Sequence, residues 1–373
     1  MKILVTGAQG FLGKNMRVEL SAHEEYEVLA YSHVLPEQTL AEYCAQADFV
    51  LHFAGVNRPR REEDFAQGNT EFTKQLLQLL QTSGSKAPVL MSSSMQAALD
   101  NPYGLSKAGA EKLLQQYAKA TGNPVYIYRL PNLFGKWGRP NYNSVVATFC
   151  YNIARGLPIQ VSERSHRLKL AYIDDVVREF LAAIEGRAHA DLDGFYSVPL
   201  VHMTTLGEIA DALQSFQESR SGSLQVPDVG NLFLKKLYST YLSYLPVDAF
   251  GYDLTTHADD RGSFTEILRT AERGQFSVNI AHPGIVKGNH WHHTKNEKFL
   301  VVSGKGLIRF RRIDEPANEI IEYHVSGKKL QVVDIPPGYT HSIANEGTEE
   351  LVTFMWCNEC FNPEHPDTYW MEV

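Results

Sequence analysis

The sequence predicts an α/β domain followed by an all-β domain: a doubly wound parallel sheet over residues 1–245 and a barrel over residues 246–373. Two observations support this fold class. Up to about Phe180, apolar strand-like runs alternate with amphipathic stretches, which is the pattern of a parallel sheet covered by helices on both faces. From about Pro246 onward, short β-branched and aromatic runs are separated by Gly, Pro, Asn and Asp, which is typical of a barrel or sandwich. A length of 373 residues fits two domains.

Each element of the first domain has a local signal. Strands are expected in the apolar runs at residues 2–8, 27–31, 49–55, 88–93 and 125–132. Helices are expected between them, after Gly13, around residues 71–81 and over residues 103–120. The boundary follows the segment YLSYLP, and we see no internal repeat or long flexible linker.

Composition excludes several classes of function. A net charge of −8 and a pI near 6.0 provide no basic surface for nucleic acid. No stretch approaches the ~20 apolar residues of a membrane helix, and the N-terminal MKILVTGAQGFLG runs into glycines where a signal peptide would have its apolar core. The four cysteines are too few and scattered for a disulfide framework, and the CxxC of Cys357 and Cys360 has no second pair to complete a zinc site. We therefore expect a cytoplasmic protein.

A glycine pattern marks the first candidate site. Gly7, Gly10 and Gly13 form GxxGxxG between an expected strand and an expected helix, where residues without Cβ let backbone amides approach a pyrophosphate. Glycines alone are weak evidence, since they also make ordinary turns. The expected cofactor-binding set in this loop is Gly7, Gln9, Gly10, Phe11, Leu12 and Gly13.

A second, independent pattern is Tyr103-x-x-x-Lys107. On a helix these residues share one face, so the ammonium can lower the phenol pKa toward neutrality and make Tyr103 a proton donor or acceptor. The serine triplet that ends at Ser94 closes the preceding strand and can place a hydroxyl beside the same substrate carbonyl. An exposed Tyr–Lys pair with no function is the simpler interpretation of either pattern alone, but their joint order disfavours it.

With these motifs the N-terminal part resembles the extended short-chain dehydrogenase/reductase family over residues 1–240. TGAQGFLG, LHFAG, the serine triplet, Tyr103-Gly-Leu-Ser-Lys107 and RLPNLFG follow in family order. The resemblance implies that Ser94 polarises the substrate oxygen, Tyr103 exchanges the proton and Lys107 also holds the nicotinamide ribose. Further expected contacts are Ser32, Ala54, Gly55 and Asn57 for the cofactor and Asn132 for the substrate. His52 is interpreted as a structural strand residue.

The end of the second expected strand bears on cofactor choice. Enzymes that use NAD place an acidic residue there to bind the ribose 2′-hydroxyl, whereas this chain has Tyr31-Ser32-His33. With no carboxylate to repel a 2′-phosphate, NADP(H) is favoured, although no obvious arginine stands at the same place.

The C-terminal domain contains a metal-ligand pattern. His290 and His292 lie two apart on an expected strand and so share a face, Glu297 follows after a turn, and His341 comes from the distant PPGYTH segment. GIVKGNHWHHTKNEKFLVVSG and PPGYTH match the two motifs of the cupin family, apart from a leading glycine replaced by Leu330. The expected metal is Zn²⁺. His293 is excluded by strand alternation, which a bulge would reverse.

Asp260-Arg261-Gly262-Ser263-Phe264-Thr265-Glu266 resembles an element of the dTDP-4-dehydrorhamnose 3,5-epimerases. That resemblance implies a sugar-nucleotide ligand, with Arg261 and Glu266 as substrate-binding residues. In those metal-free enzymes the histidine that matches His290 is the base, but here it would be a metal ligand. The base is therefore open, and Lys287 is a candidate for polarising the ketone or moving the proton, as is the metal itself for stabilising an enolate.

Together the two halves resemble a family of two-domain capsular polysaccharide enzymes that act on UDP-2-acetamido-2,6-dideoxy-hexos-4-uloses. The resemblance implies C3 epimerisation by the cupin, then NADPH-dependent reduction at C4 to the L-talose sugar, on the route to UDP-N-acetyl-L-fucosamine. It also implies a homo-oligomer, at least a dimer. The rival interpretation is a non-catalytic NADP(H) sensor with a sugar-binding cupin, which the retained Tyr103 and Lys107 disfavour.

Overall fold

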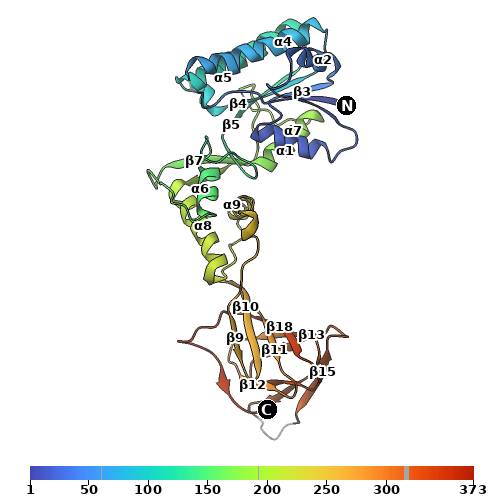
Figure 1. Ribbon diagram of the computed structural model, residues 1–373, viewed down its shortest axis with the longest axis vertical. Coiled ribbons are helices and arrows are strands. Elements are labelled where there is room, and N and C mark those ends of the chain that lie inside the picture. Colours follow the sequence, from blue (N-terminus) through green and yellow to red (C-terminus); the bar gives the residue numbers. More distant parts are fainter. Residues whose placement is uncertain (60, 192, 315–318) are drawn as a thin grey trace. The chain divides into compact units, whose positions relative to one another are not determined.

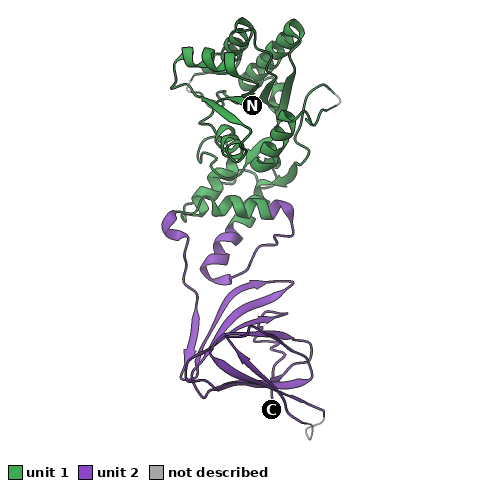
Figure 2. Ribbon diagram, turned by 90° about the vertical axis from the view of Figure 1, so that its right-hand side faces the viewer, with its two compact units in different colours: residues 1–213, 235–246 green, residues 214–234, 247–373 purple. Residues whose placement is uncertain are grey.

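The computed structural model of the protein describes residues 1–59, 61–191, 193–314 and 319–373 (Figure 1). The chain forms two compact units, coloured separately in Figure 2: Met1–Leu213 with Lys235–Pro246, and Gln214–Leu234 with Val247–Val373. The first unit ends at Pro246, one residue beyond the expected boundary at residue 245. Gln214–Leu234, which was expected in the first domain, belongs to the second unit. The domain limits 1–245 and 246–373 therefore stay a prediction.

A five-stranded parallel sheet forms the centre of the first unit, in the order β2-β1-β3-β4-β5. Its strands are β1 (Lys2–Thr6), β2 (Glu27–Tyr31), β3 (Phe49–His52), β4 (Val89–Ser94) and β5 (Val125–Leu130). The chain places β2 on one side of β1 and then β3, β4 and β5 on the other, so the direction of winding reverses between β1 and β3. Ligands of such folds bind outside the carboxyl ends of the strands at this position. The expected α/β class of the first unit is confirmed.

Helices cover both faces of this sheet (Figure 1). On β1, Leu4 packs in a cluster with α2, α4 and α5, whereas Ile3 and Val5 pack in another with α1 and α7. All three side chains are fully buried, as expected for a strand covered on both faces.

The helices and helical turns of the described residues are α1 (Phe11–Leu20), α2 (Glu37–Gln46), α3 (Glu63–Phe65), the π-helical turn η1 (Ala66–Glu71), α4 (Phe72–Thr82), η2 (Met95–Ala98), α5 (Pro102–Thr121), α6 (Val145–Ile153), α7 (Ile173–Ile184), α8 (Leu206–Glu218), the π-helical turn η3 (Ser219–Ser223), α9 (Leu232–Leu242) and η4 (Val247–Ala249).

The run expected as one strand over residues 125–132 is two strands in the structure. Pro131 has no N–H to donate to a sheet, so the ladder of β5 ends at Leu130. The chain then enters a second sheet of three strands, in the order β6-β7-β8. These strands are β6 (Asn132–Phe134), β7 (Arg167–Tyr172) and β8 (His202–Thr205).

Beyond its short helical segments, all of which precede residue 250, the second unit contains two antiparallel sheets, which confirms a cupin-like β domain. One has the order β16-β13-β18-β11-β10-β9 and the other β15-β14-β17-β12-β19. A hydrophobic cluster contains residues of both, such as Phe299 and Val301 from the first and Ile308 and Ile343 from the second. The strands are β9 (Thr256–Asp259), β10 (Gly262–Thr270), β11 (Gly274–Ala281), β12 (Val286–Trp291), β13 (Glu297–Ser303), β14 (Lys305–Arg312), β15 (Ile321–Ser326), β16 (Val332–Ile335), β17 (Tyr339–Asn345), β18 (Leu351–Cys357) and β19 (Tyr369–Trp370). Within the described ranges, no helix is long and apolar enough to cross a membrane.

Candidate functional site

Close backbone packing explains two of the three glycines after β1. A Cβ added to Gly7 would lie 2.6 Å from the backbone nitrogen of Ala54, and one added to Gly13 would lie 2.4 Å from the carbonyl oxygen of Gly7. Gly7 also has a φ of +66°, a conformation that other residues rarely adopt. The Gly10 amide donates to the Gly7 carbonyl at 2.8 Å, which closes the turn into α1.

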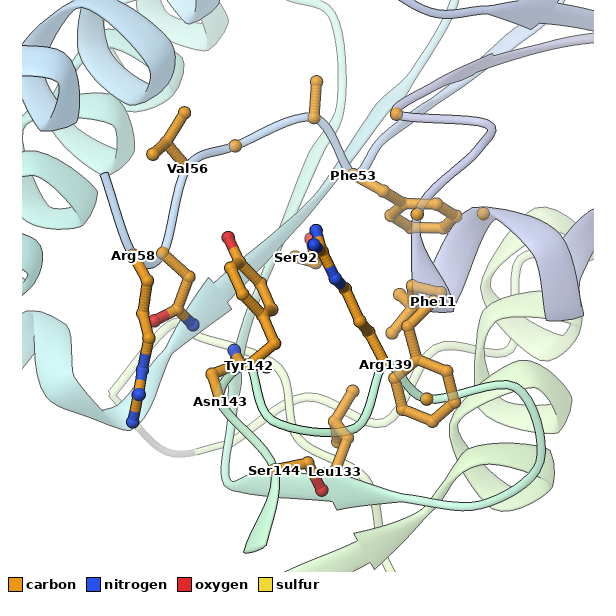
Figure 3. A pocket seen from close by; sticks show the side chains of 18 of the residues that line it. Phe11, Phe53, Val56, Arg58, Ser92, Leu133, Arg139, Tyr142, Asn143 and Ser144 are labelled. Carbon is orange, nitrogen blue, oxygen red and sulfur yellow. The ribbon is translucent and has the colours of Figure 1, made fainter. Parts of the chain in front are cut away.

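A cavity of about 1790 Å³ opens at the carboxyl ends of β1, β3 and β4 (Figure 3). It brings together every residue predicted for the cofactor and reductase site. These lining residues are Gly7, Gln9, Gly10, Phe11, Leu12, Gly13, Ser32, Ala54, Gly55, Asn57, Ser94, Tyr103, Lys107 and Asn132.

Ser94, Tyr103 and Lys107 come from the end of β4 and the start of α5. The Tyr103 hydroxyl is hydrogen-bonded to Ser94. Helix α5 begins where expected because Asn101 accepts a hydrogen bond from the Gly104 amide at 2.8 Å and Pro102 occupies the first turn. One turn further on, the Lys107 ammonium donates to the Ser92 carbonyl at 2.9 Å, so β4 and α5 hold the three side chains on one wall of the cavity.

Burial shifts the pKa of both ionisable groups. It raises the pKa of Tyr103, a shift that the hydrogen bond from Ser94 opposes and that Tyr142 increases. The expected lowering of the Tyr103 pKa by Lys107 is therefore wrong for this structure, in which the ammonium points to the Ser92 carbonyl. Burial also lowers the pKa of Lys107 to about 8, against the opposing effect of Glu111.

His52 is structural, as expected. It is 2 % exposed, and its ring nitrogens lie 2.8 and 2.9 Å from the hydroxyls of Thr6 and Thr73. Burial lowers its pKa to about 3, which keeps the ring neutral.

Asn69 is a site residue that the sequence analysis missed. It lies in the π-helical turn η1, and its side chain accepts from the Val56 amide at 2.9 Å and donates to the Val56 carbonyl at 3.0 Å. It also donates to the Ser106 hydroxyl at 2.9 Å. Asn69 thereby fixes the cavity loop after β3 to helix α5.

Arg139 and Tyr142 are two further residues that the sequence analysis did not single out. Figure 3 shows them projecting side by side into the cavity from the loop that follows β6, with the guanidinium carbon 5.2 Å from the centre of the Tyr142 ring. Among the described residues no carboxylate pairs with Arg139. The other cations on the cavity wall are Lys14, Arg58 and Lys107, and Glu37 is the one carboxylate among the lining residues that the structure describes. The cavity thus favours an anionic ligand.

In the second unit, the predicted metal ligands lie together. One possible donor atom from each of His290, His292, Glu297 and His341 lies within 4.8 Å of the others. Pairing of β12 with β17 puts His290 directly opposite His341. The bulge in β12 lies between Gly288 and His290, ahead of both candidate histidines, so His292 and not His293 joins the group.

The donor set fits a divalent cation. His292 Nε2 and His341 Nε2 lie 3.7 and 3.4 Å from Glu297 Oε2, and these three buried atoms have no hydrogen-bond partner among the described residues. Burial alone would raise the pKa of Glu297. The nearby imidazoles of His292 and His341 have the larger, opposite effect, so the pKa is lowered and the carboxylate stays charged. Buried donors without partners are costly, and three histidines with one carboxylate are ordinary ligands of Zn²⁺ and similar ions.

The remaining predicted residues of this domain have protein partners. Lys287 is opposite Ile343 in the β12–β17 pair. Ile343 lies two residues after His341 on β17, so Lys287 and His341 share one face of the sheet. The Lys287 ammonium donates to Asn279 Oδ1 at 2.9 Å and to the Ile280 carbonyl at 2.8 Å. Burial lowers its pKa. Arg261 is exposed and pairs with Asp259, and Glu266 pairs with Arg269.

The fold and the cavity define an oxidoreductase of the short-chain dehydrogenase/reductase type joined to a cupin-like β domain. Residues 3–197 match the NAD dependent epimerase/dehydratase family, and residues 257–369 match the polysaccharide biosynthesis C-terminal domain. The chain belongs to the first of these families over its N-terminal half and is an NAD(P)-dependent enzyme, so the sensor interpretation is not favoured.

Several known proteins are similar to the chain. The capsular polysaccharide assembling protein CapF from Staphylococcus aureus is 54% identical with a TM-score of 0.94, and the match covers 100% of both chains. UDP-2-acetamido-2,6-beta-L-arabino-hexul-4-ose reductase from Pseudomonas aeruginosa is 46% identical over 99% of this chain and 98% of its own. The protein RMD from the same species, solved with NADPH, is 25% identical with a TM-score of 0.50, over 58% of this chain and 85% of its own.

Proposed function

We propose that the chain converts UDP-2-acetamido-2,6-dideoxy-L-arabino-hexos-4-ulose in two steps. The cupin-like domain inverts C3, and the reductase domain then reduces the C4 ketone with NADPH to give UDP-2-acetamido-2,6-dideoxy-L-talose. The observation that carries this proposal is the placement of Ser94, Tyr103 and Lys107 on one wall of the cavity in a chain 46% identical, almost end to end, to a reductase of a UDP-linked 4-keto sugar.

In the reduction, Tyr103 donates a proton to the C4 oxygen, and Ser94 hydrogen-bonds to that oxygen. NADPH, when bound, supplies the hydride. The raised pKa of Tyr103 suits this direction of reaction because the phenol stays protonated at neutral pH. Lys107 holds the ribose hydroxyls of the cofactor and keeps a positive charge beside the developing alkoxide.

NADPH is preferred over NADH in this proposal. No acidic residue directly follows Ser32 at the end of β2, and the cations Lys14 and Arg58 outnumber the one described carboxylate on the cavity wall, Glu37. A ratio of kcat/KM values that favours NADH would contradict this preference.

Arg139 binds the diphosphate of the sugar nucleotide. Its guanidinium projects into the cavity (Figure 3), and no described carboxylate pairs with it. A guanidinium forms two parallel hydrogen bonds with phosphate oxygens, so this geometry suits a nucleoside diphosphate.

For the epimerisation, His290, His292, Glu297 and His341 hold Zn²⁺. The ion, when bound, supplies a Lewis acid that stabilises negative charge developing at the C4 oxygen after the C3 proton leaves. Lys287 is the candidate for moving that proton, because it shares the sheet face of His341 and its lowered pKa eases loss of a proton. Arg261 and Glu266 bind the substrate. Epimerisation precedes reduction because the C3 proton is acidic only while C4 is a ketone.

The experiment that tests this function is incubation of the whole protein with the UDP-linked 4-keto sugar in D₂O, with and without NADPH, followed by NMR. Without NADPH we expect deuterium at C3 and an unreduced ketone. With NADPH we expect the 4-hydroxy product that carries deuterium at C3. Reduction without C3 exchange would contradict the epimerase assignment.

We further propose that the protein is a homo-oligomer, at least a dimer, located in the cytoplasm. The four free cysteines are compatible with a reducing compartment. Light scattering of the purified chain measures the oligomeric state directly.

A further inference from the structure

The C-terminal end of the chain lies along the strand that carries the first metal-ligand histidine. In the pairing of β19 with β12, Trp370 is opposite His290. Beyond this pair, the Met371 amide donates to the Asn289 carbonyl at 2.9 Å. We call residues 367–373 the C-terminal strap.

The strap also contacts the second ligand histidine. The backbone carbonyl oxygen of Asp367 lies 2.6 Å from Nδ1 of His292, a ring that is 2 % exposed. Because a carbonyl oxygen can only accept a hydrogen bond, Nδ1 must carry the proton of the neutral ring. The lone pair is then on Nε2, the nitrogen that lies 3.7 Å from Glu297 in the ligand group.

The carboxylate of Asp367 holds the loop between the second and third ligands. It accepts hydrogen bonds at 2.9 Å from the backbone amides of residues 293–295, and another at 3.2 Å from the Thr294 hydroxyl. This loop joins His292 to Glu297, so one side chain fixes the backbone between the two ligands.

A third contact reaches the neighbour of the last ligand. The hydroxyl of Thr340, which is fully buried, donates to the carbonyl of Met371. Thr340 immediately precedes His341. The strap therefore contacts the chain at or beside each of the three ligand histidines.

We propose that the C-terminal strap positions the metal ligands: Asp367 selects the His292 tautomer that can bind a metal and fixes the loop that leads to Glu297. This proposal rests on the metal site proposed above. Asp367 is a positioning residue rather than a ligand, because its carboxylate is occupied by four donors and does not join the ligand group. Changes in residues of this kind typically weaken metal binding about 10- to 100-fold.

The test measures Zn²⁺ affinity of the full-length protein by competition with a coloured chelator. Asp367→Ala removes the carboxylate that fixes residues 293–295 and keeps the backbone carbonyl, so it releases the strap from this loop and should raise the Kd for Zn²⁺ about 10- to 100-fold. Glu364→Ala is the matched control, and it should leave the Kd unchanged. It removes an exposed carboxylate, three residues before Asp367, that has no partner among the described residues. The Kd for NADPH should be unchanged in both variants.

Two further measurements separate positioning from a merely structural role. The visible spectrum of the Co²⁺-loaded protein reports ligand geometry, and it should change in Asp367→Ala but not in Glu364→Ala. Thr340→Val removes the contact to Met371 with little change in volume, and it should also weaken Zn²⁺ binding, which keeps the proposal testable if Asp367→Ala fails to fold.

The outcomes are distinguishable. If Asp367→Ala and Thr340→Val bind Zn²⁺ as tightly as the unaltered protein and give the same Co²⁺ spectrum, the strap has no positioning role. If the unaltered protein itself binds no Zn²⁺, the proposed metal site fails, and this inference fails with it.

Discussion

The charge of Lys107 depends on its burial. The residue is 6 % exposed, and burial lowers the pKa of its ammonium to about 8. A lysine is charged below its pKa and neutral above it, so the ammonium that we propose to hold the cofactor ribose is progressively lost above pH 8. We expect NADPH oxidation by the enzyme to fall roughly tenfold per pH unit well above that value.

The pH–rate profile of kcat/KM checks this expectation, and Lys107→Arg supplies the comparison. An arginine stays charged throughout the accessible range, so any residual activity of the variant should lack the alkaline limb near pH 8. A limb at the same pH in both proteins would assign it to another group.

Arg139 offers a second prediction at the scale of one residue. A hydrogen bond to a charged group contributes about 1.5–3 kcal/mol, so Arg139→Ala should weaken binding of UDP roughly 10- to 100-fold. Calorimetric titration with UDP and with NADPH checks this. Arg187→Ala is the control, because that exposed arginine pairs with Glu185 outside the cavity. Weaker NADPH binding with unchanged UDP binding would place Arg139 on the cofactor instead.

Individual residues differed in how far the sequence could predict them. Tyr103 and Lys107 belong to a local pattern on one helix, so spacing alone predicted that they share a face, and the family resemblance added Ser94. Arg139 has no such pattern, because its position depends on the path of a loop after β6. The direction of the Tyr103 pKa shift was also beyond prediction, since it depends on burial, on the hydrogen bond from Ser94 and on the nearby Tyr142.

At the scale of elements, the π-helical turn η1 positions the loop after β3. Asn69 makes three hydrogen bonds from this turn, two to Val56 and one to Ser106. Loss of buried hydrogen bonds typically costs about 1–3 kcal/mol. We therefore expect Asn69→Ala to lower thermal stability and to weaken NADPH binding, measured by calorimetry, whereas Lys74→Ala on the exposed face of α4 should change neither.

The regular elements were predictable because their signals are local. Strands β1 to β4 are apolar runs, and α5 begins within one residue of the helix expected over residues 103–120. One exception has a local cause, a proline inside the apolar run, and the other has a non-local cause. Pro131 divides an apolar run between two sheets, and the bulge of β12 at Asn289, where φ is +59°, depends on pairing with β17 and β19.

At the scale of the whole molecule, the proximity of the four proposed metal ligands was predictable although they are distant in sequence. Two short motifs fixed the ligand types, and strand pairing then placed His290 opposite His341. The role of the C-terminal strap was not predictable, because Asp367 lies outside both motifs and reaches His292 only through the fold.

The last prediction is that the two reactions are chemically separable, since their residues belong to different compact units. Tyr103→Phe removes the proposed proton donor, a loss that typically costs 10²–10⁴-fold in rate, while the glycine loop proposed to bind NADPH stays intact. His341→Ala removes a metal ligand and leaves the reductase cavity unchanged. In D₂O, deuterium should therefore enter C3 of the 4-keto sugar with Tyr103→Phe but not with His341→Ala, and neither variant alone should form the reduced product. A mixture of the two should form it again, because the epimerised ketone can leave one molecule and enter another. If C3 exchange needed Tyr103 and survived the loss of His341 and of the metal, the cupin-like domain would not be the epimerase.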